Sequence, residues 1–271
     1  MTAPARIAVI AGRGALPAAL VASLAERPIL ATLDGFAPQA LTPDLTFRIE
    51  RLVPFLDQLA ERGVTAVTFA GAVTRPRLDP ALIDPETAQL LPRLLAAMGQ
   101  GDDATLREVI AIFEEFDLAV LGVADIAPGL LPGPGLYAGA VSPPDARDAD
   151  RAAAIVAALG AVDVGQGAVV QQGLCLGVET LAGTDALLAS VANLPHVLRP
   201  DPALGKGVFL KAPKPGQDRR IDVPTIGEAT VTGAADAGLG GLVWTAGGVI
   251  CLDLPAMQAK AAARGLFLWA R

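Results

Sequence analysis

The sequence predicts an α/β fold in two domains, and three observations support this prediction. Short aliphatic runs typical of buried strands alternate with helix-length segments along the whole chain. The chain is 52% hydrophobic but only 4% aromatic, so its core is built mainly from Ala, Val, Leu and Ile, which suits the packing of helices on a sheet. Prolines and glycines gather near the middle of the chain, as at a domain boundary.

The N-terminal half is expected to alternate between strand and helix. Its strands are short runs rich in Val, Ile and Ala that end at Gly, Pro or Asp. Asp102 and Asp103 follow Gly101 at a predicted helix start. They could be metal or ribose ligands, but capping of the helix and its dipole explain acidic residues there equally well. Strands are predicted over residues 6–10, 28–33, 65–70 and 118–123, and helices over 18–26, 54–62, 85–98 and 102–116.

The C-terminal half shows the same alternation after a segment rich in Pro and Gly. Residues 131–144 have no clear period, and we interpret them as a linker between domains at 1–130 and 145–271. Thr184 or Asp185 can cap a helix that ends at Ala192. Further helices are predicted over 145–159, 227–237 and 255–264, and strands over 168–171, 174–179, 207–211, 241–244, 248–252 and 266–270.

Two glycine turns follow predicted strands of the first domain. Gly12 and Gly14 come directly after the first strand, and Gly71, Thr74 and Arg75 come after the strand at 65–70. A strand, a glycine turn and a helix start can aim backbone N–H groups at a phosphate, and ligands of open α/β sheets bind at the carboxyl ends of strands. A tight turn without a ligand explains each motif equally well. Together the two turns favour a Rossmann-like nucleotide-binding domain.

The charge and the apolar patterning exclude several classes of protein. The formal net charge of −7 argues against a general nucleic-acid binder, so any phosphate binding has to be local. We find neither an uninterrupted apolar run of membrane-spanning length nor a basic segment followed by an apolar one at the N-terminus. We therefore expect a protein that is soluble or attached peripherally to a membrane.

The few thiols and the single histidine restrict the metal chemistry. Cys175 and Cys251 both lie in apolar, strand-like runs, and we predict that both are buried free thiols. With His196 as the single histidine, the ligand count excludes a conventional zinc centre. A metal in this protein would be held by oxygen atoms, and Mg²⁺ is the first choice.

The segment Lys211–Gly227 is the main candidate for chemistry. Its three prolines fix their own φ angles and disfavour helix, which predicts a stiffened loop with charges at fixed spacing. A solvated basic surface loop is the alternative. The carboxylates of Asp218 and Asp222 can serve Mg²⁺ or orient a water molecule. The donors available to neutralise phosphate charge are Lys211, Lys214, Arg219 and Arg220.

Five motifs are spread in order over nearly the whole chain. They are Ile-Ala-Gly-x-Gly-x-Leu-Pro (10–17), Phe-Ala-Gly-x-Val-x-Arg-Pro (69–76), Gly-Asp-Asp (101–103), Gly-Gln-Gly-Ala-Val-Val (165–170) and Lys-Pro-Gly-Gln-Asp-Arg-Arg-Ile-Asp-Val-Pro-Thr-Ile-Gly (214–227). Together they resemble the LpxI family of UDP-2,3-diacylglucosamine pyrophosphatases of lipid A biosynthesis. The match at residues 214–227 is the most specific, and Arg13 departs mildly from the expected small residue.

The resemblance implies the hydrolysis of UDP-2,3-diacylglucosamine to UMP and lipid X by attack of water at the α-phosphorus, with Mg²⁺ required. It implies an N-terminal nucleotide domain, a C-terminal domain for the acylated sugar, a cytoplasmic location at the inner membrane and a homodimer. Asp222 is then needed for turnover, with Lys214 and Arg220 as further catalytic candidates and Asp218 as a second metal ligand. The predicted substrate-binding residues are Gly12, Gly14, Gly71, Thr74, Arg75, Gln166, Gly167, Lys211, Gln217 and Thr225.

Two other functions remain open at this point. A non-catalytic module that binds a UDP-sugar or a lipid explains the glycine turns, but it gives Asp218 and Asp222 no role. A nicotinamide-dependent oxidoreductase depends on the first glycine turn alone. The sequence lacks the third glycine of that dinucleotide motif, and Asp34 is only a loosely placed ribose ligand.

Overall fold

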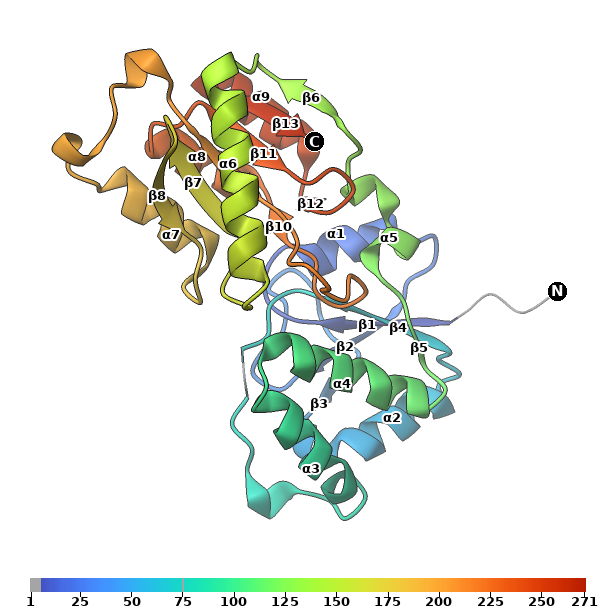
Figure 1. Ribbon diagram of the computed structural model, residues 1–271. Coiled ribbons are helices and arrows are strands. Elements are labelled where there is room, and N and C mark those ends of the chain that lie inside the picture. Colours follow the sequence, from blue (N-terminus) through green and yellow to red (C-terminus); the bar gives the residue numbers. More distant parts are fainter. Residues whose placement is uncertain (1–5, 75) are drawn as a thin grey trace. The chain divides into compact units, whose positions relative to one another are not determined.

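The computed structural model describes residues 6–74 and 76–271, and the chain divides into two compact units. The first unit comprises the residues up to 128 together with residues 218–222, and the second comprises residues 129–217 and 223–271. Each unit combines helices with its own sheet (Figure 1), which confirms the predicted α/β class with two domains.

The described residues of the first unit form a five-stranded, fully parallel sheet in the order β3-β2-β1-β4-β5. Chain order reverses direction between β1 and β4, so the loops that follow these two strands flank the point where ligands bind in open α/β sheets. The strands are β1 (Ile7–Ala11), β2 (Ile29–Leu33), β3 (Leu45–Phe47), β4 (Ala66–Ala70) and β5 (Ala119–Val120).

Helices of the first unit bury apolar stripes against this sheet. In α2, Leu52, Phe55, Leu56 and Leu59 repeat at helical spacing, and all four are buried. They join side chains of α4 and of the strands in one core cluster. The helices are α1 (Leu16–Ser23), α2 (Leu52–Glu61), α3 (Thr87–Met98), α4 (Asp102–Glu115) and α5 (Val123–Ile126), with short 3-10 turns η1 (Ile49–Arg51) and η2 (Pro80–Leu82).

The described residues of the second unit form a six-stranded mixed sheet in the order β6-β13-β11-β9-β7-β8. The central strands β13, β11 and β9 are parallel, and β7, β8 and β6 extend the sheet in antiparallel fashion. The strands are β6 (Gly135–Ala138), β7 (Gly167–Gln171), β8 (Leu174–Val178), β9 (Val208–Lys211), β11 (Gly241–Trp244) and β13 (Phe267–Ala270), and β10 (Thr225–Ile226) and β12 (Ile250–Cys251) make a separate parallel pair.

Helices cover both faces of this second sheet. On one face α6 (Pro143–Gly160) buries Ala149, Ala152 and Val156 against β7 and β9 (Figure 1). The N-cap of α6 is Ser142, whose hydroxyl accepts a bond from the backbone N–H of Asp145. The opposite face packs against α7 (Gly183–Ala192), α8 (Glu228–Asp236) and α9 (Leu254–Arg264), and the remaining 3-10 turns are η3 (Pro128–Leu130), η4 (His196–Leu198) and η5 (Pro202–Leu204).

Two differences between the second unit and the sequence interpretation concern β6 and Cys175. The predicted linker at residues 131–144 contains β6, which pairs with β13 and so belongs to the second sheet. The strand was missed because two glycines and flanking prolines obscure its alternation. Cys175 is exposed, against the prediction that it is buried, because β8 lies at the edge of the sheet; Cys251 is buried as predicted, and both thiols are free.

The two thiols should differ in reactivity. Burial raises the pKa of the Cys251 thiol to about 12, while Cys175 is open to solvent. We expect one thiol of the native protein to react with a disulfide reagent at pH 8, and the second to react only after denaturant is added. Cys175→Ser should abolish the fast reaction. Equal rates for both thiols in the native protein would contradict this arrangement.

Candidate active site

The loops after β1 and β4 are joined directly to each other. The backbone N–H of Arg13 donates to the carbonyl of Ala72 at 2.9 Å, and the N–H of Ala72 donates back to Arg13 at 2.9 Å. A Cβ atom on Gly12 would lie 2.6 Å from the carbonyl oxygen of Ala72, and one on Gly71 would lie 2.7 Å from that of Arg13. Both glycines are therefore required for the two loops to pair, whether or not a ligand binds.

Gly14 has a different environment from these two glycines. It is exposed, its φ is +97°, and a Cβ atom placed on it would meet nothing within 4 Å. It lies two residues before Leu16, where α1 begins, and no side chain caps that helix. Pro17 has no N–H, so the first turn of α1 offers the amides of Leu16 and Ala18, and these donors next to an open glycine can accept a phosphate. Thr74 is also exposed in the second loop, and Arg75 lies outside the described residues.

Residues 218–222 lie in the middle of the segment Lys211–Gly227 and form a turn that belongs to the first unit. The carbonyl of Asp218 accepts the backbone N–H groups of Ile221 and Asp222 at 3.4 and 3.3 Å, which closes the turn. The side chain of Ile221 packs against the core of the first unit. The backbone of Arg219 and Arg220 lies close to Gly122, where a Cβ atom would be 3.2 Å from it. Because Gly122 follows β5, the turn packs beside the carboxyl end of that strand.

An ion-pair network holds this turn in place. The guanidinium of Arg220 donates to both carboxylate oxygens of Asp218, with a shortest distance of 2.7 Å, and its Nη1 donates to Glu114 of α4 at 2.7 Å. The backbone N–H of Arg220 adds a further bond to Asp218 at 3.0 Å. The side-chain bonds from Arg220 lower the pKa of the Asp218 carboxyl, so it stays ionised. Asp218 and Arg220 therefore position the turn.

Asp222 ends this turn and is half-buried. Its carboxylate comes from the turn that Arg220 and Asp218 hold, so its position is fixed through its neighbours. Residues 6–74 and 76–271 contain no group of three or more His, Cys, Asp or Glu side chains arranged to hold a metal ion. The roles predicted for Asp222 in turnover, and for Asp218 and Asp222 as metal ligands, stay predictions.

Residues 211–217, the first part of the segment Lys211–Gly227, belong to the second unit and are held by separate hydrogen bonds and ion pairs. The side-chain oxygen of Gln217 accepts from the amide of Gln166 at 3.0 Å and from the backbone N–H of Lys214 at 2.9 Å. The ammonium of Lys214 contacts Asp163 at 2.5 Å. Three residues that the sequence singled out, Gln166, Lys214 and Gln217, are thus brought together. Thr225 lies in β10, and its hydroxyl donates to the carbonyl of Val223.

Lys211 is part of a buried cluster that the sequence did not reveal. Its ammonium contacts both oxygens of Glu179 at 2.7 and 2.5 Å and the hydroxyl of Thr184 at 2.9 Å. The sequence prediction that Thr184 or Asp185 caps a helix is wrong: α7 begins at Gly183 without a side-chain cap, and the hydroxyl of Thr184 bonds to Glu179 and Lys211. A Cβ atom on Gly167 would lie 2.7 Å from the Glu179 carboxylate, so this glycine makes room for the ion pair. In the sequence, the two glycines at 165 and 167 were the signal that another group lies close to the backbone here.

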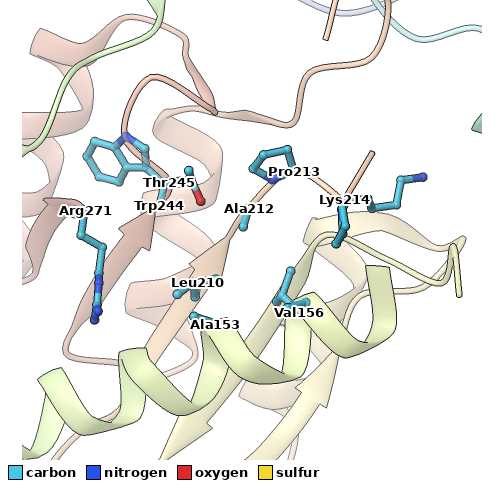
Figure 2. Close-up of a pocket in the computed structure, with 11 residues that line it drawn as sticks. Ala153, Val156, Leu210, Ala212, Pro213, Lys214, Trp244, Thr245 and Arg271 are labelled. Atoms are coloured by element: carbon cyan, nitrogen blue, oxygen red, sulfur yellow. The ribbon is translucent and has the colours of Figure 1, made fainter. Parts of the chain in front are cut away.

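A cavity of about 400 Å³ lies in the second unit between α6 and the end of β9 (Figure 2). Ala153, Val156, Leu210 and Ala212 give it an apolar lining. Figure 2 shows Lys214 and Arg271 on opposite sides of these residues. Arg271 contacts Asp150 at 2.7 Å and lies over the ring of Trp269. The volume falls within the range of small-molecule sites, and the mainly apolar lining, with an ion pair on either side, suits an amphipathic ligand.

In the part of the chain that the structure describes, none of the helices combines the length and the apolar character needed to cross a bilayer.

Comparisons with known proteins match both halves of the chain. The family model of the LpxI N-terminal domain matches residues 6–130, and that of the LpxI C-terminal domain matches residues 134–269. A protein from Caulobacter vibrioides named UDP-2,3-diacylglucosamine pyrophosphatase LpxI is 38% identical over 270 residues. That alignment covers 97% of this chain and 96% of the relative.

The pairing of the two glycine loops predicts unequal costs for two similar substitutions. Gly71 and Gly14 have nearly the same φ, +95° and +97°, but only at Gly71 would a Cβ atom meet backbone. Gly14→Ala should cost roughly 1–2 kcal/mol of unfolding free energy from backbone strain. Gly71→Ala should cost about 1–3 kcal/mol more from overpacking. Urea unfolding of both variants measures the difference, and equal losses would show that the loops do not need this close approach.

The Asp218–Arg220 pair predicts a pH-dependent contribution to stability. Because the pKa of Asp218 is lowered in the folded protein, its contribution is fully present above about pH 4, the ordinary pKa of Asp, and is lost as the pH falls through the folded value. Asp218→Asn should lower stability at pH 7 by on the order of 1 kcal/mol.

Thermal unfolding of Asp218→Asn and wild type, followed by circular dichroism from pH 7 to pH 3, measures this contribution. The gap between the two proteins should narrow as the pH falls. Asp236→Asn, which removes the exposed partner of Arg264, is the control and should cost less. A gap of constant size across this pH range would mean that the carboxylate charge of Asp218 does not hold the turn.

Proposed function

The chain belongs to the LpxI family, and we propose on this basis that it hydrolyses UDP-2,3-diacylglucosamine in lipid A biosynthesis. The products are UMP and 2,3-diacylglucosamine 1-phosphate. One observation carries the proposal: the named relative aligns along 97% of this chain, so both domains are present in the same order.

The reaction breaks one phosphoanhydride bond. A water oxygen attacks the α-phosphorus, the bond from this phosphorus to the bridging oxygen breaks, and the acylated sugar leaves as its 1-phosphate. Negative charge grows on the leaving phosphate, so the site has to supply positive charge or hydrogen-bond donors at that point. A proton also has to leave the attacking water, which requires a base or a group that orients the water.

Residues of the first unit suit the nucleotide end of the substrate. The open backbone at Gly14 and the first amides of α1 can accept a phosphate, and Thr74 adds a hydroxyl in the neighbouring loop. Asp222 supplies a carboxylate on a turn of the same unit that Arg220 and Asp218 hold in a fixed position. We assign Asp222 to the orientation of the attacking water or to binding of a metal ion.

The donor set fits Mg²⁺, which we include in the proposal. Mg²⁺ is usually held by one or two carboxylates together with substrate phosphates, and a cage made entirely of protein ligands is not needed. Asp222 is the carboxylate we assign to it, because both oxygens of Asp218 already accept bonds from Arg220. When bound, the ion would neutralise charge on the phosphates.

Residues of the second unit suit the acylated sugar phosphate. The cavity beside α6 has an apolar lining for hydrocarbon, and a phosphate bound there would compete with Asp163 for Lys214 and with Asp150 for Arg271. Lys211 contributes through its ion pair with Glu179, which positions the end of β9. The acyl chains of the substrate also motivate a cytoplasmic enzyme in peripheral contact with the inner membrane, and we extend the proposal to a homodimer on the family resemblance.

The test is UMP release from UDP-2,3-diacylglucosamine, with Mg²⁺ and with a chelator. Asp222→Ala should lower turnover by about 10²-fold or more, and a loss much beyond 10⁴-fold would favour a metal role over general-base assistance. In ¹⁸O-labelled water the label should appear in UMP, because water attacks the α-phosphorus.

Asp57→Ala, which changes an exposed aspartate on α2, is the matched control and should keep full activity. Mass spectrometry of small molecules that copurify gives a second readout, with intact substrate expected in Asp222→Ala and product in wild type. Binding of the intact substrate by both proteins without UMP release would instead indicate a binding module.

A further inference from the structure

Exposed apolar side chains gather at one end of the second unit. We define the docking segment as residues 193–206, which connect α7 to β9 and contain η4 and η5. Within it Val197, Leu198 and Leu204 are 89%, 61% and 67% exposed. In Figure 1 this orange segment projects away from the helices and strands of its unit. Leu174, at the turn between β7 and β8, is also exposed.

The outward position of these side chains is fixed by hydrogen bonds. The guanidinium of Arg199 donates to the carbonyl of Ala237 at 2.6 Å and to the side-chain oxygen of Gln171 at 3.2 Å. The amide of Gln171 donates to the carbonyl of Gly205 at 3.0 Å, and that of Gln172 donates to Asp201 at 2.5 Å. These bonds use the polar groups of the docking segment on its inner side, so its apolar side chains face solvent.

The side of the unit that carries the docking segment also carries basic residues. Lys206 lies in the segment and is exposed, and Arg147 and Arg151 are exposed one turn apart on α6. The Nε of Arg151 donates to the carbonyl of Gly173, beside Leu174, which places this face of α6 next to the turn between β7 and β8.

Few free acids oppose these cations. Within the segment the exposed charges are Lys206 and Asp201, which balance each other, because the guanidinium of Arg199 bonds on the inner side. On α6 the carboxylates of Asp145 and Asp148 are buried and accept backbone N–H groups, and Asp150 pairs with Arg271, so Arg147 and Arg151 are the exposed cations of this face. The apolar tips therefore stand in a locally basic surface of an acidic protein.

We propose that the docking segment, with Arg147, Arg151 and Lys206 around it, binds the surface of a lipid bilayer that carries anionic headgroups. Apolar side chains that enter the interface and basic side chains beside them are the two features that together hold a peripheral protein on such a surface. The reason for membrane binding rests on the proposed function, because an acylated substrate resides in a bilayer. The location of the surface rests on the exposed apolar and basic residues described above.

The experiment compares wild type with the triple variant Val197→Ser, Leu198→Ser, Leu204→Ser. Both proteins are sedimented with vesicles of phosphatidylcholine and with vesicles that also contain phosphatidylglycerol. Wild type should bind the anionic vesicles, and the triple variant should bind them about tenfold or more weakly. Lys206→Glu should remove part of the preference for anionic over neutral vesicles, about fivefold or more for the lost and reversed charge.

Leu181→Ser is the matched control. Leu181 is 98% exposed but precedes α7, at the opposite end of that helix from the docking segment, so its variant should bind vesicles like wild type. Circular dichroism should show that all variants keep the fold. Failure of wild type to bind anionic vesicles, or binding of the triple variant at wild-type strength, would overturn the proposal. A change of the triple variant from dimer to monomer would also overturn it, since the segment would then join two copies of this chain.

Activity separates this inference from the proposed function. The triple variant should release UMP at the wild-type rate when the substrate is dissolved in detergent, and more slowly when the substrate is embedded in vesicles. Equal rates for both proteins on vesicles would overturn the docking surface. Absence of UMP release by wild type in detergent would overturn the proposed function instead, while vesicle binding still decides the docking surface.

Discussion

The placement of one five-residue turn is the constraint on which the rest of the candidate site depends. Residues 218–222 are held by the first unit, although the residues on both sides belong to the second. Arg220 achieves this by bonding Asp218 within the turn and Glu114 on α4, and Ile221 adds an apolar anchor. One unbroken sequence motif thus serves two units: Lys211, Lys214 and Gln217 are fixed by side chains of the second unit, and Asp222 is fixed by the first.

Much of the fold could be predicted because the deciding forces are local. Aliphatic runs bounded by Gly and Pro, and stripes at helical spacing such as that of α2, determine strand and helix before tertiary contacts act. The misses occurred where long-range contacts decide. The strand β6 exists because β13 pairs with it, and Cys175 is exposed because β8 is an edge strand, and neither fact is encoded near those residues.

The candidate site could be predicted only in part, for the same reason. Sequence identified the segment that carries Asp222 and both glycine loops, because charge, Pro and Gly are visible in a linear chain. It could not tell that Gly12 and Gly71 accommodate each other's loops while Gly14 faces open space. It also could not tell that Asp218 is bonded to Arg220, which Glu114, a residue far along the chain, helps to hold in place.

The buried pair of Lys211 and Glu179 has a consequence for how this sequence can change over evolutionary time. Replacing either residue alone leaves an uncompensated charge inside the second unit, which typically costs about 3–5 kcal/mol, whereas an apolar pair of similar volume can be tolerated. Gly167 is tied to the same pair, because any side chain there meets the carboxylate. Related chains should therefore keep these three residues together or replace them together, so that a substitution at one position is accompanied by substitutions at the other two.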